Sequence, residues 1–169
     1  AEVRGANQLL TRDTIADLIA ARLVAETARM RTEFSVSGRV PTTLIDNLLP
    51  DDLAREIFER FPAPERMVLK RSIKELKYVA AQMNEYESFL EETVFAFQDM
   101  RVVRAIGDIT TLQKLEPDAH LYAGGISLMT KGGYLRPHLD NSHDGGQQRY
   151  RALNLLYYLT PGWREEDGG

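Results

Sequence analysis

One window of the sequence combines residue types that could hold a metal ion. His138 and Asp140 lie two positions apart within residues 135–141, which we predict to be a β-strand. Alternate side chains of a strand share a face, so an imidazole nitrogen and a carboxylate oxygen could reach one ion. Such a pair supplies two of the three ligands of a 2-His-1-carboxylate site for non-haem Fe(II).

The spacing alone leaves other interpretations open. The two side chains could form an exposed loop pair or a structural hydrogen bond. A hydrolytic zinc site would add His143, but the GGQQ sequence that follows predicts a surface turn that takes His143 away from the strand. Arg136 shares the predicted face and could pair with a substrate carboxylate or remain a solvated charge at the rim. We interpret His120 as a surface or packing histidine.

Composition limits the chemistry further. The chain has no cysteine and three histidines, which excludes disulfides, zinc-thiolate sites, iron–sulfur clusters and thiol nucleophiles. Its 21 basic and 25 acidic residues give a net charge of -4 without a basic block, which argues against nucleic acid or anionic lipid as a partner. There is no run of about 18 apolar residues that would cross a membrane. The N-terminus lacks the pattern of a signal peptide, so we expect a cytoplasmic location.

The predicted secondary-structure elements that must position His138 and Asp140 follow a simple order, with helices first and strands afterwards. Apolar residues near a 3.6-residue period predict helices at residues 11–34, at 51–60, from about 84 and at 99–106. Asn84 and Glu87 resemble a capping box for the third helix, and Gly107 is in the position of a left-handed cap for the fourth. Strands are predicted at residues 42–45, within 67–82, and at 125–130, 135–141 and 152–160.

This order indicates an α+β chain in which helices pack on one side of an antiparallel sheet or barrel. The 169 residues, 43% of them hydrophobic, are enough for a core. We expect a single domain over residues 1–169, mainly helical in residues 1–116 and built of strands in residues 117–169.

The stretch GGYLRPHLDNSHDGGQQRYRALNLLYYLTPGWREEDGG, residues 132–169, resembles the Fe(II)- and 2-oxoglutarate-dependent dioxygenases. Within that family it is similar to the branch of prolyl hydroxylases and bacterial amino-acid hydroxylases. The match consists of a glycine and aromatic lead-in, H-x-D-N, an arginine before a second strand, a strand ending in YYL, a tryptophan and a closing GG. Several features in this order are more specific than H-x-D alone. The resemblance implies a double-stranded β-helix, a jelly-roll or cupin-like barrel, of which this chain holds the N-terminal helices and the first strands.

The resemblance also implies roles for individual residues. His138 and Asp140 would be the proximal histidine and the carboxylate of the iron site. Tyr158 matches the second tyrosine of YYL, whose phenol helps to bind 2-oxoglutarate, unless it is a packing aromatic. Asn154 matches a polar position on the same face of that strand and is assigned to cosubstrate binding with it. We interpret Tyr157 as a packing residue.

The family completes its site with a distal histidine and a basic residue that pairs with the far carboxylate of 2-oxoglutarate. It places both on strands that would follow Gly169, so we expect this chain to end partway through the barrel. The implied reaction uses dioxygen and 2-oxoglutarate to hydroxylate a C–H bond, with succinate as coproduct. Family members that halogenate have a small residue where this chain has Asp140, so hydroxylation is favoured.

The expected partner is a small-molecule substrate, a free or N-acylated aliphatic amino acid such as an N-succinyl one. A peptidyl proline or another protein side chain is the alternative within this class. From a different class, the chain could be a non-catalytic jelly-roll that binds a ligand and has lost the iron site. The sequence leaves the oligomeric state open and is compatible with a homodimer.

Overall fold

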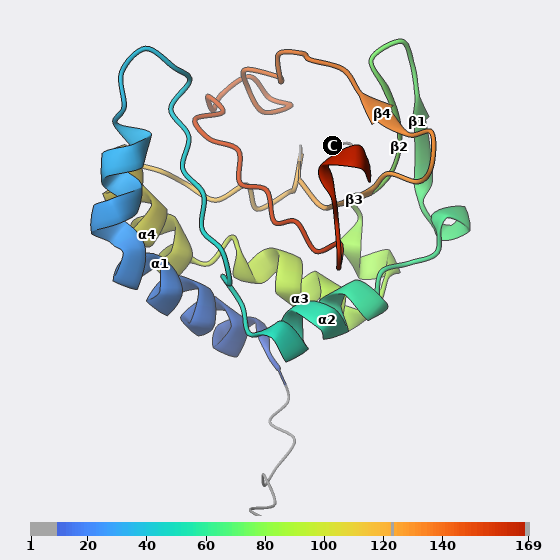
Figure 1. The fold of residues 1–169 in the computed structure, drawn as a ribbon, viewed down its shortest axis with the longest axis horizontal. Helices are drawn as coiled ribbons and strands as arrows, with labels where there is room; N and C mark the ends of the chain where they lie inside the picture. Colours follow the sequence, from blue (N-terminus) through green and yellow to red (C-terminus); the bar gives the residue numbers. More distant parts are fainter. Residues whose placement is uncertain (1–9, 123, 168–169) are drawn as a thin grey trace, which may run out of the picture.

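The computed structural model describes residues 10–122 and 124–167, which combine helices with a small sheet. The helices are α1 (Arg12–Phe34), α2 (Asp51–Glu59), α3 (Ser88–Ala96) and α4 (Met100–Thr110), with short 3-10 turns η1 (Pro64–Arg66), η2 (Met83–Glu85) and η3 (Glu165–Asp167). The strands are β1 (Val68–Arg71), β2 (Glu75–Ala80), β3 (Ile126–Leu128) and β4 (Tyr134–Leu135). In Figure 1 the helices lie along the lower and left parts of the view and the strands at the right. The predicted α+β class with an antiparallel sheet is confirmed, but the predicted order is wrong, because β1 and β2 precede α3 and α4.

Helix α1 begins with a capping box and carries one face of the core. The Thr11 hydroxyl accepts a hydrogen bond from the Thr14 backbone N–H, and the Thr14 hydroxyl accepts one from the Thr11 N–H. Ile15 and Ile19 are fully buried, and the helix packs against α3 and α4. Leu18, which the periodicity placed on the same face, is 39% exposed. The helix itself is therefore confirmed, but its buried face is narrower than predicted.

The hydrophobic core lies between the helices. Its buried side chains come from all four of them and include Ile15, Ile19, Leu53, Ile57, Leu90, Val102 and Ile109. Tyr157 and Leu159 pack against this cluster from the C-terminal segment, and the Tyr157 ring lies 5.5 Å from that of Phe97, centroid to centroid. The predicted packing role of Tyr157 is confirmed. Because burying one large apolar side chain stabilises the fold by about 1.5–3 kcal/mol, the helical layer is the main source of stability.

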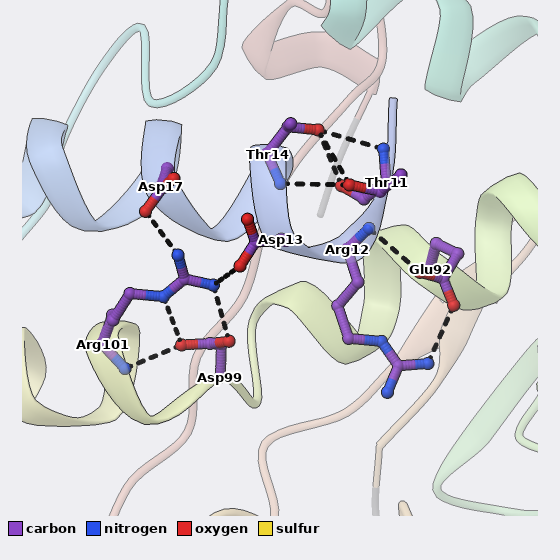
Figure 2. Close-up of polar contacts among 8 residues, drawn as sticks. All are labelled: Thr11, Arg12, Asp13, Thr14, Asp17, Glu92, Asp99 and Arg101. Carbon is purple, nitrogen blue, oxygen red and sulfur yellow. Dashed lines mark hydrogen bonds and ion pairs between the residues drawn. The ribbon is translucent and has the colours of Figure 1, made fainter. Parts of the chain in front are cut away.

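An ion-pair network attaches α4 to α1. The Arg101 guanidinium binds Asp99 at the start of its own helix and Asp13 and Asp17 on α1 (Figure 2). Asp99 also caps α4, because its carboxylate accepts the Arg101 backbone N–H at 2.8 Å. The hydrogen bonds from Arg101 lower the pKa of Asp99 to about 2. The network therefore sets the position of α4 along α1.

A second contact of this kind ties α1 to α3, and Figure 2 shows it beside the first. The Arg12 guanidinium and the Arg12 backbone N–H both donate to the Glu92 carboxylate, each at 2.9 Å. The guanidinium also lies 4.9 Å from the centroid of the Phe95 ring, within the range of a cation–π contact. The start of α1 is thus held by charged contacts from two other helices.

Strand β2 is the centre of the antiparallel sheet. β1 pairs along one edge of β2, while β3 and β4 share the other edge, β3 along its C-terminal half and β4 along its N-terminal half. Between β3 and β4 the chain makes a turn, closed by a 2.7 Å hydrogen bond from the Gly133 N–H to the Thr130 carbonyl. A Cβ at Gly133 would lie 2.9 Å from that carbonyl oxygen, which explains the glycine. The turn predicted at Gly132 and Gly133 is confirmed.

The predicted strand at residues 42–45 is wrong, because side chains of α1 bind the backbone of this region. Arg29 donates to the Leu44 carbonyl at 3.1 Å, and Arg22 donates to the Asn47 carbonyl at 3.3 Å. Backbone carbonyls need a hydrogen-bond partner, and here arginines provide one in place of a neighbouring strand. Residues 42–47 therefore lie along α1 without regular secondary structure.

The capping box predicted for α3 is also wrong. Asn84 belongs to η2, and the helix begins after both proposed capping residues. The Glu87 side chain makes no cap hydrogen bond; its carboxylate instead pairs with Arg60 of the α2 C-cap at 3.1 Å. A long-range ion pair therefore replaces the local contact that the sequence pattern suggested.

Helix α4 continues through the glycine that we predicted as its cap. Gly107 is helical, and Thr111 takes the left-handed conformation with φ of 60°. A Cβ at Gly107 would lie 3.3 Å from the Leu112 carbonyl oxygen. The glycine is explained by this close approach of the segment after the helix, not by a positive φ.

The strands of the C-terminal part are shorter than predicted. Those expected at 125–130 and 135–141 are reduced to β3 and β4, and residues 152–160 form no strand with any described segment. The last sheet contact after β4 is the hydrogen bond from the Arg136 N–H to the Lys74 carbonyl, 2.8 Å, at the turn between β1 and β2. Past that turn β2 offers no further backbone, so residues 137–141 have no strand to pair with. Among the described residues the sheet stays open and does not close into a barrel.

A helix that crosses a membrane must be both long and apolar. Within residues 10–122 and 124–167, no helix is both long enough and apolar enough to cross a membrane.

Candidate metal site

His138 and Asp140 lie together in the irregular segment after β4. The His138 Nε2 atom is 3.3 Å from the Asp140 Oδ1 atom, although the strand that was expected to align them is absent. On the other side of the ring, Nδ1 is 2.7 Å from the Arg136 carbonyl oxygen. A carbonyl oxygen only accepts, so Nδ1 carries the proton.

This tautomer determines what can lie between the two side chains. With Nδ1 protonated, a bare lone pair on Nε2 would be repelled by the Asp140 carboxylate. Nε2 must therefore either carry a second proton or direct its lone pair at a cation that lies between the two groups. Metal-bound histidines commonly donate their other N–H to a backbone carbonyl in this way. The two donor atoms, an imidazole nitrogen and a carboxylate oxygen, thus fit a divalent ion of the Fe(II) type.

Three polar groups surround the Asp140 carboxylate. The Asn154 side-chain amide donates a hydrogen bond to Oδ2, and the Arg151 guanidinium lies 3.8 Å from Oδ1, the oxygen that also faces His138. The hydrogen bond from Asn154, followed by the charges of Arg151 and His138, holds the pKa of Asp140 below its ordinary value against the opposing effect of partial burial. The Asp140 side chain is still 40% exposed, so it is both ionised and accessible.

A short hairpin brings the second half of this site back to the first. The chain crosses the top of the view in Figure 1 after β4 and then returns toward the helices. His143 and Tyr150 form an antiparallel bridge, and the Arg151 N–H donates to the Ser142 carbonyl at 2.9 Å. The Asp144 carboxylate closes the turn by accepting backbone N–H groups from the residues that follow. The turn predicted from GGQQ therefore sets the distance between the two halves of the site.

His143 stays with this hairpin. Its Nδ1 atom is 2.8 Å from the Ser142 hydroxyl, and its ring packs edge-on against Tyr150, 5.6 Å between centroids. Within the described ranges, no group of three His, Asp or Glu side chains is placed to hold a metal. The alternative of a zinc site formed by His138, Asp140 and His143 is therefore wrong. His120 lies exposed in a turn, as expected for a surface histidine.

The two remaining candidates, Arg136 and Tyr158, have other surroundings. The Arg136 guanidinium lies 5.6 Å from the centroid of the Tyr134 ring, a contact at the edge of the sheet. Tyr158 is 81% exposed and follows Asn154 and Leu156 along one row of residues 152–160, while Tyr157 faces the core. The alternation that places Asn154 and Tyr158 on one face is present even though the segment lacks strand pairing.

Sequence reasoning missed two features of the site. The contact of the Asn154 side chain with Asp140 was not predicted beside its assignment to cosubstrate binding, and Arg151 had no predicted role beyond being part of the motif. Residues 151 and 154 are an odd number of positions apart, so a regular strand would direct them to opposite faces. Their shared contact depends on the irregular backbone after the hairpin, and the only available signal was the arginine in the motif.

Comparison of the chain with protein-family models, curated proteins and solved structures found no match. The closing Gly168 and Gly169 of the motif lie outside the described residues. The geometry of this site and the motif that contains it therefore carry the functional proposal.

Proposed function

We propose that the protein is an Fe(II)- and 2-oxoglutarate-dependent dioxygenase. It hydroxylates an aliphatic C–H bond of a free or N-acylated amino acid, for example an N-succinyl one. The observation that carries the proposal is the approach of His138 Nε2 to Asp140 Oδ1, 3.3 Å apart, with Nδ1 bonded to a backbone carbonyl. This donor set suits Fe(II) and leaves positions open for other ligands.

The rest of the centre follows from the motif. In this proposal a distal histidine and a basic residue that binds 2-oxoglutarate complete the centre. The described strands are the first part of a double-stranded β-helix whose remaining strands cover the exposed row of Asn154, Leu156 and Tyr158. The Tyr158 hydroxyl would then help to bind 2-oxoglutarate.

In this proposal the metal ion and the cosubstrate supply the oxidation, and the protein side chains hold and orient them. Bound Fe(II) and 2-oxoglutarate together activate dioxygen: one oxygen atom enters the substrate C–H bond as hydroxyl, the other enters succinate, and carbon dioxide leaves. His138 and Asp140 hold the ion, and Asn154 keeps the carboxylate oriented and ionised. Because the Asp140 carboxylate fills the position that a halide would need, the proposed outcome is hydroxylation.

A protein side chain, such as a peptidyl proline, is the second candidate substrate. One observation favours it. Residues 152–160 have no strand partner among the described residues and expose Leu156 and Tyr158 at 71% and 81%. Such an edge could bind an extended peptide by adding it as a strand.

The proposal is tested by anaerobic titration of the full-length protein with Fe(II) and 2-oxoglutarate. We expect a weak visible charge-transfer band and a raised melting temperature, because ligands that bind the folded state stabilise it. Asp140→Ala is the control and should lose both responses. Absence of both responses in the wild type would overturn the proposal and leave the non-catalytic jelly-roll that binds a ligand as the alternative.

The substrate class needs a separate assay. The loaded enzyme is incubated in air with N-succinyl amino acids, free amino acids and proline-containing peptides, and each mixture is analysed for succinate and for a product that has gained one oxygen atom. Coupled product from the amino acids supports the first candidate, and product from peptides alone supports the second.

A further inference from the structure

The two oxygen atoms of the Asp140 carboxylate have different surroundings. Oδ2 accepts the hydrogen bond of the Asn154 amide. Oδ1 faces His138 Nε2 at 3.3 Å and has the Arg151 guanidinium at 3.8 Å. One oxygen is therefore already committed to a neutral donor, while the other lies beside the second proposed metal ligand.

We infer that Asn154 is a positioning residue that makes Asp140 a one-oxygen metal ligand, binding through Oδ1. This inference rests on the proposed function and adds to it the determinant of the coordination mode. A carboxylate that bound through both oxygens would have to break the hydrogen bond to Asn154. It would also occupy one of the open positions that a cosubstrate and dioxygen need.

Arg151 acts on the same carboxylate in the opposite direction. Its guanidinium lies near Oδ1, so a divalent ion bound to that oxygen is repelled by a like charge. The Arg151 side chain is 26% exposed, so water and salt screen this repulsion only in part. Asn154 thus favours binding of the ion by orienting the carboxylate, and Arg151 weakens it by charge.

Asn154 and Arg151 are expected to change metal affinity in opposite directions, and this difference can be measured on the full-length protein. Mn(II), a hard divalent ion with an EPR signal, is titrated at fixed pH, and free Mn(II) is measured by EPR. Asn154→Leu removes the donor at similar side-chain size, and Arg151→Gln removes the charge. Thr160→Val is the matched control, because Thr160 is exposed on the same row as Asn154.

We expect Asn154→Leu to weaken Mn(II) binding by about 10- to 100-fold, as found when outer partners of metal ligands are removed. Arg151→Gln should tighten binding and reduce its dependence on ionic strength, and Thr160→Val should leave it unchanged. Asn154→Ser, which retains a hydroxyl donor, should recover part of the loss. With Fe(II) and 2-oxoglutarate, Asn154→Leu should also weaken the visible charge-transfer band, since a carboxylate that binds through both oxygens competes with the cosubstrate.

The outcomes separate this inference from the proposed function. If the wild type does not bind Mn(II) or Fe(II), both are overturned. If the wild type binds and Asn154→Leu binds equally well with an unchanged band, the inference alone is overturned. Equal weakening by Asn154→Leu and Arg151→Gln, with a matching fall in melting temperature, would also overturn it, because it would show damage to the fold in place of opposite effects on one carboxylate.

Discussion

The state of one imidazole decides how the candidate site is interpreted. The hydrogen bond between His138 Nδ1 and the Arg136 carbonyl fixes the proton on that nitrogen and directs Nε2 toward Asp140. The carboxylate is held ionised chiefly by Asn154. An isolated surface pair needs neither of these supports, so their combination supports the proposal that this H-x-D pair holds a metal ion.

At the scale of single residues, the first prediction concerns Asp140. Asp140→Gly removes the carboxylate that faces His138 Nε2 at 3.3 Å, so the proposed hydroxylation should fall to background. The measurement is mass spectrometry of the product together with succinate release. Glu116→Gly is the control, since Glu116 is an exposed acid that pairs with Arg149, and it should retain activity. Undiminished succinate formation coupled to hydroxylated product in Asp140→Gly would contradict the assignment.

At the scale of elements, helices and strands depend on different kinds of contact. The helices have local signals, and long-range ion pairs such as Arg101 with Asp13 then fix how they pack. The strands have few local signals and depend on close approach between segments distant in sequence, as at Gly125, where β3 begins beside the end of β2.

The second prediction uses this close approach. Gly125 has φ of +102°, and an added Cβ would overlap the Ala80 carbonyl oxygen. Gly125→Ala should therefore lower the free energy of unfolding by about 1–3 kcal/mol, measured by urea denaturation. Gly38→Ala is the matched control, because Gly38 also has a positive φ, +83°, but its Cβ would meet no atom within 4 Å. Equal losses in the two variants would show that backbone strain alone, without the contact, explains the result.

The third prediction concerns the cap of α4 and its pH dependence. The pKa of Asp99 is lowered from 3.8 to about 2 in the folded state, first by its hydrogen bond from Arg101. Its ionised form therefore stabilises the fold above the unfolded pKa, and this contribution is lost as the pH falls through about 4 toward 2. Asp99→Asn, which keeps a cap acceptor and loses the charge, should be less stable than wild type at pH 7.

Urea denaturation at several pH values measures this difference, which should shrink toward zero near pH 2. Asp99→Ala also removes the cap and should cost about 0.5–2 kcal/mol at any pH. A gap between wild type and Asp99→Asn that stays constant with pH would exclude the charge of Asp99 as its source.

At the scale of the whole molecule, stability and the candidate site lie in different parts. The buried apolar side chains concentrate between the four helices, whereas residues 136–156 are mostly exposed and carry the site. Tyr157 and Leu159 link the two, because they pack on the helical core from the segment that presents Asn154 to Asp140. The helical layer is thus the support on which the site is held.

The fourth prediction follows from this division. Ile19 is fully buried, and Ile19→Ala should lower the free energy of unfolding by about 2–5 kcal/mol. Leu156 is 71% exposed, so Leu156→Ala should change it by less than about 0.5 kcal/mol in the 169-residue chain. Urea denaturation measures both. A large loss in Leu156→Ala would reveal that this row is covered in solution.

The sequence by itself determined what is local. The 3.6-residue period defined α1 to within one residue at its start, because a helix is held by contacts between residues close in the chain. The glycine turn before β4 and the pairing of His138 with Asp140 were also readable, since both depend on a few consecutive residues.

Only the tertiary structure decided what depends on distant segments. The length of β4 was limited by the length of its partner β2. Residues 42–45 form no strand, because an arginine of α1 binds their backbone. The contacts of Asn154 and Arg151 with Asp140 arise from the hairpin that brings the chain back on itself. No periodicity encodes such contacts, because they join positions whose separation in the chain is unrelated to their distance in space.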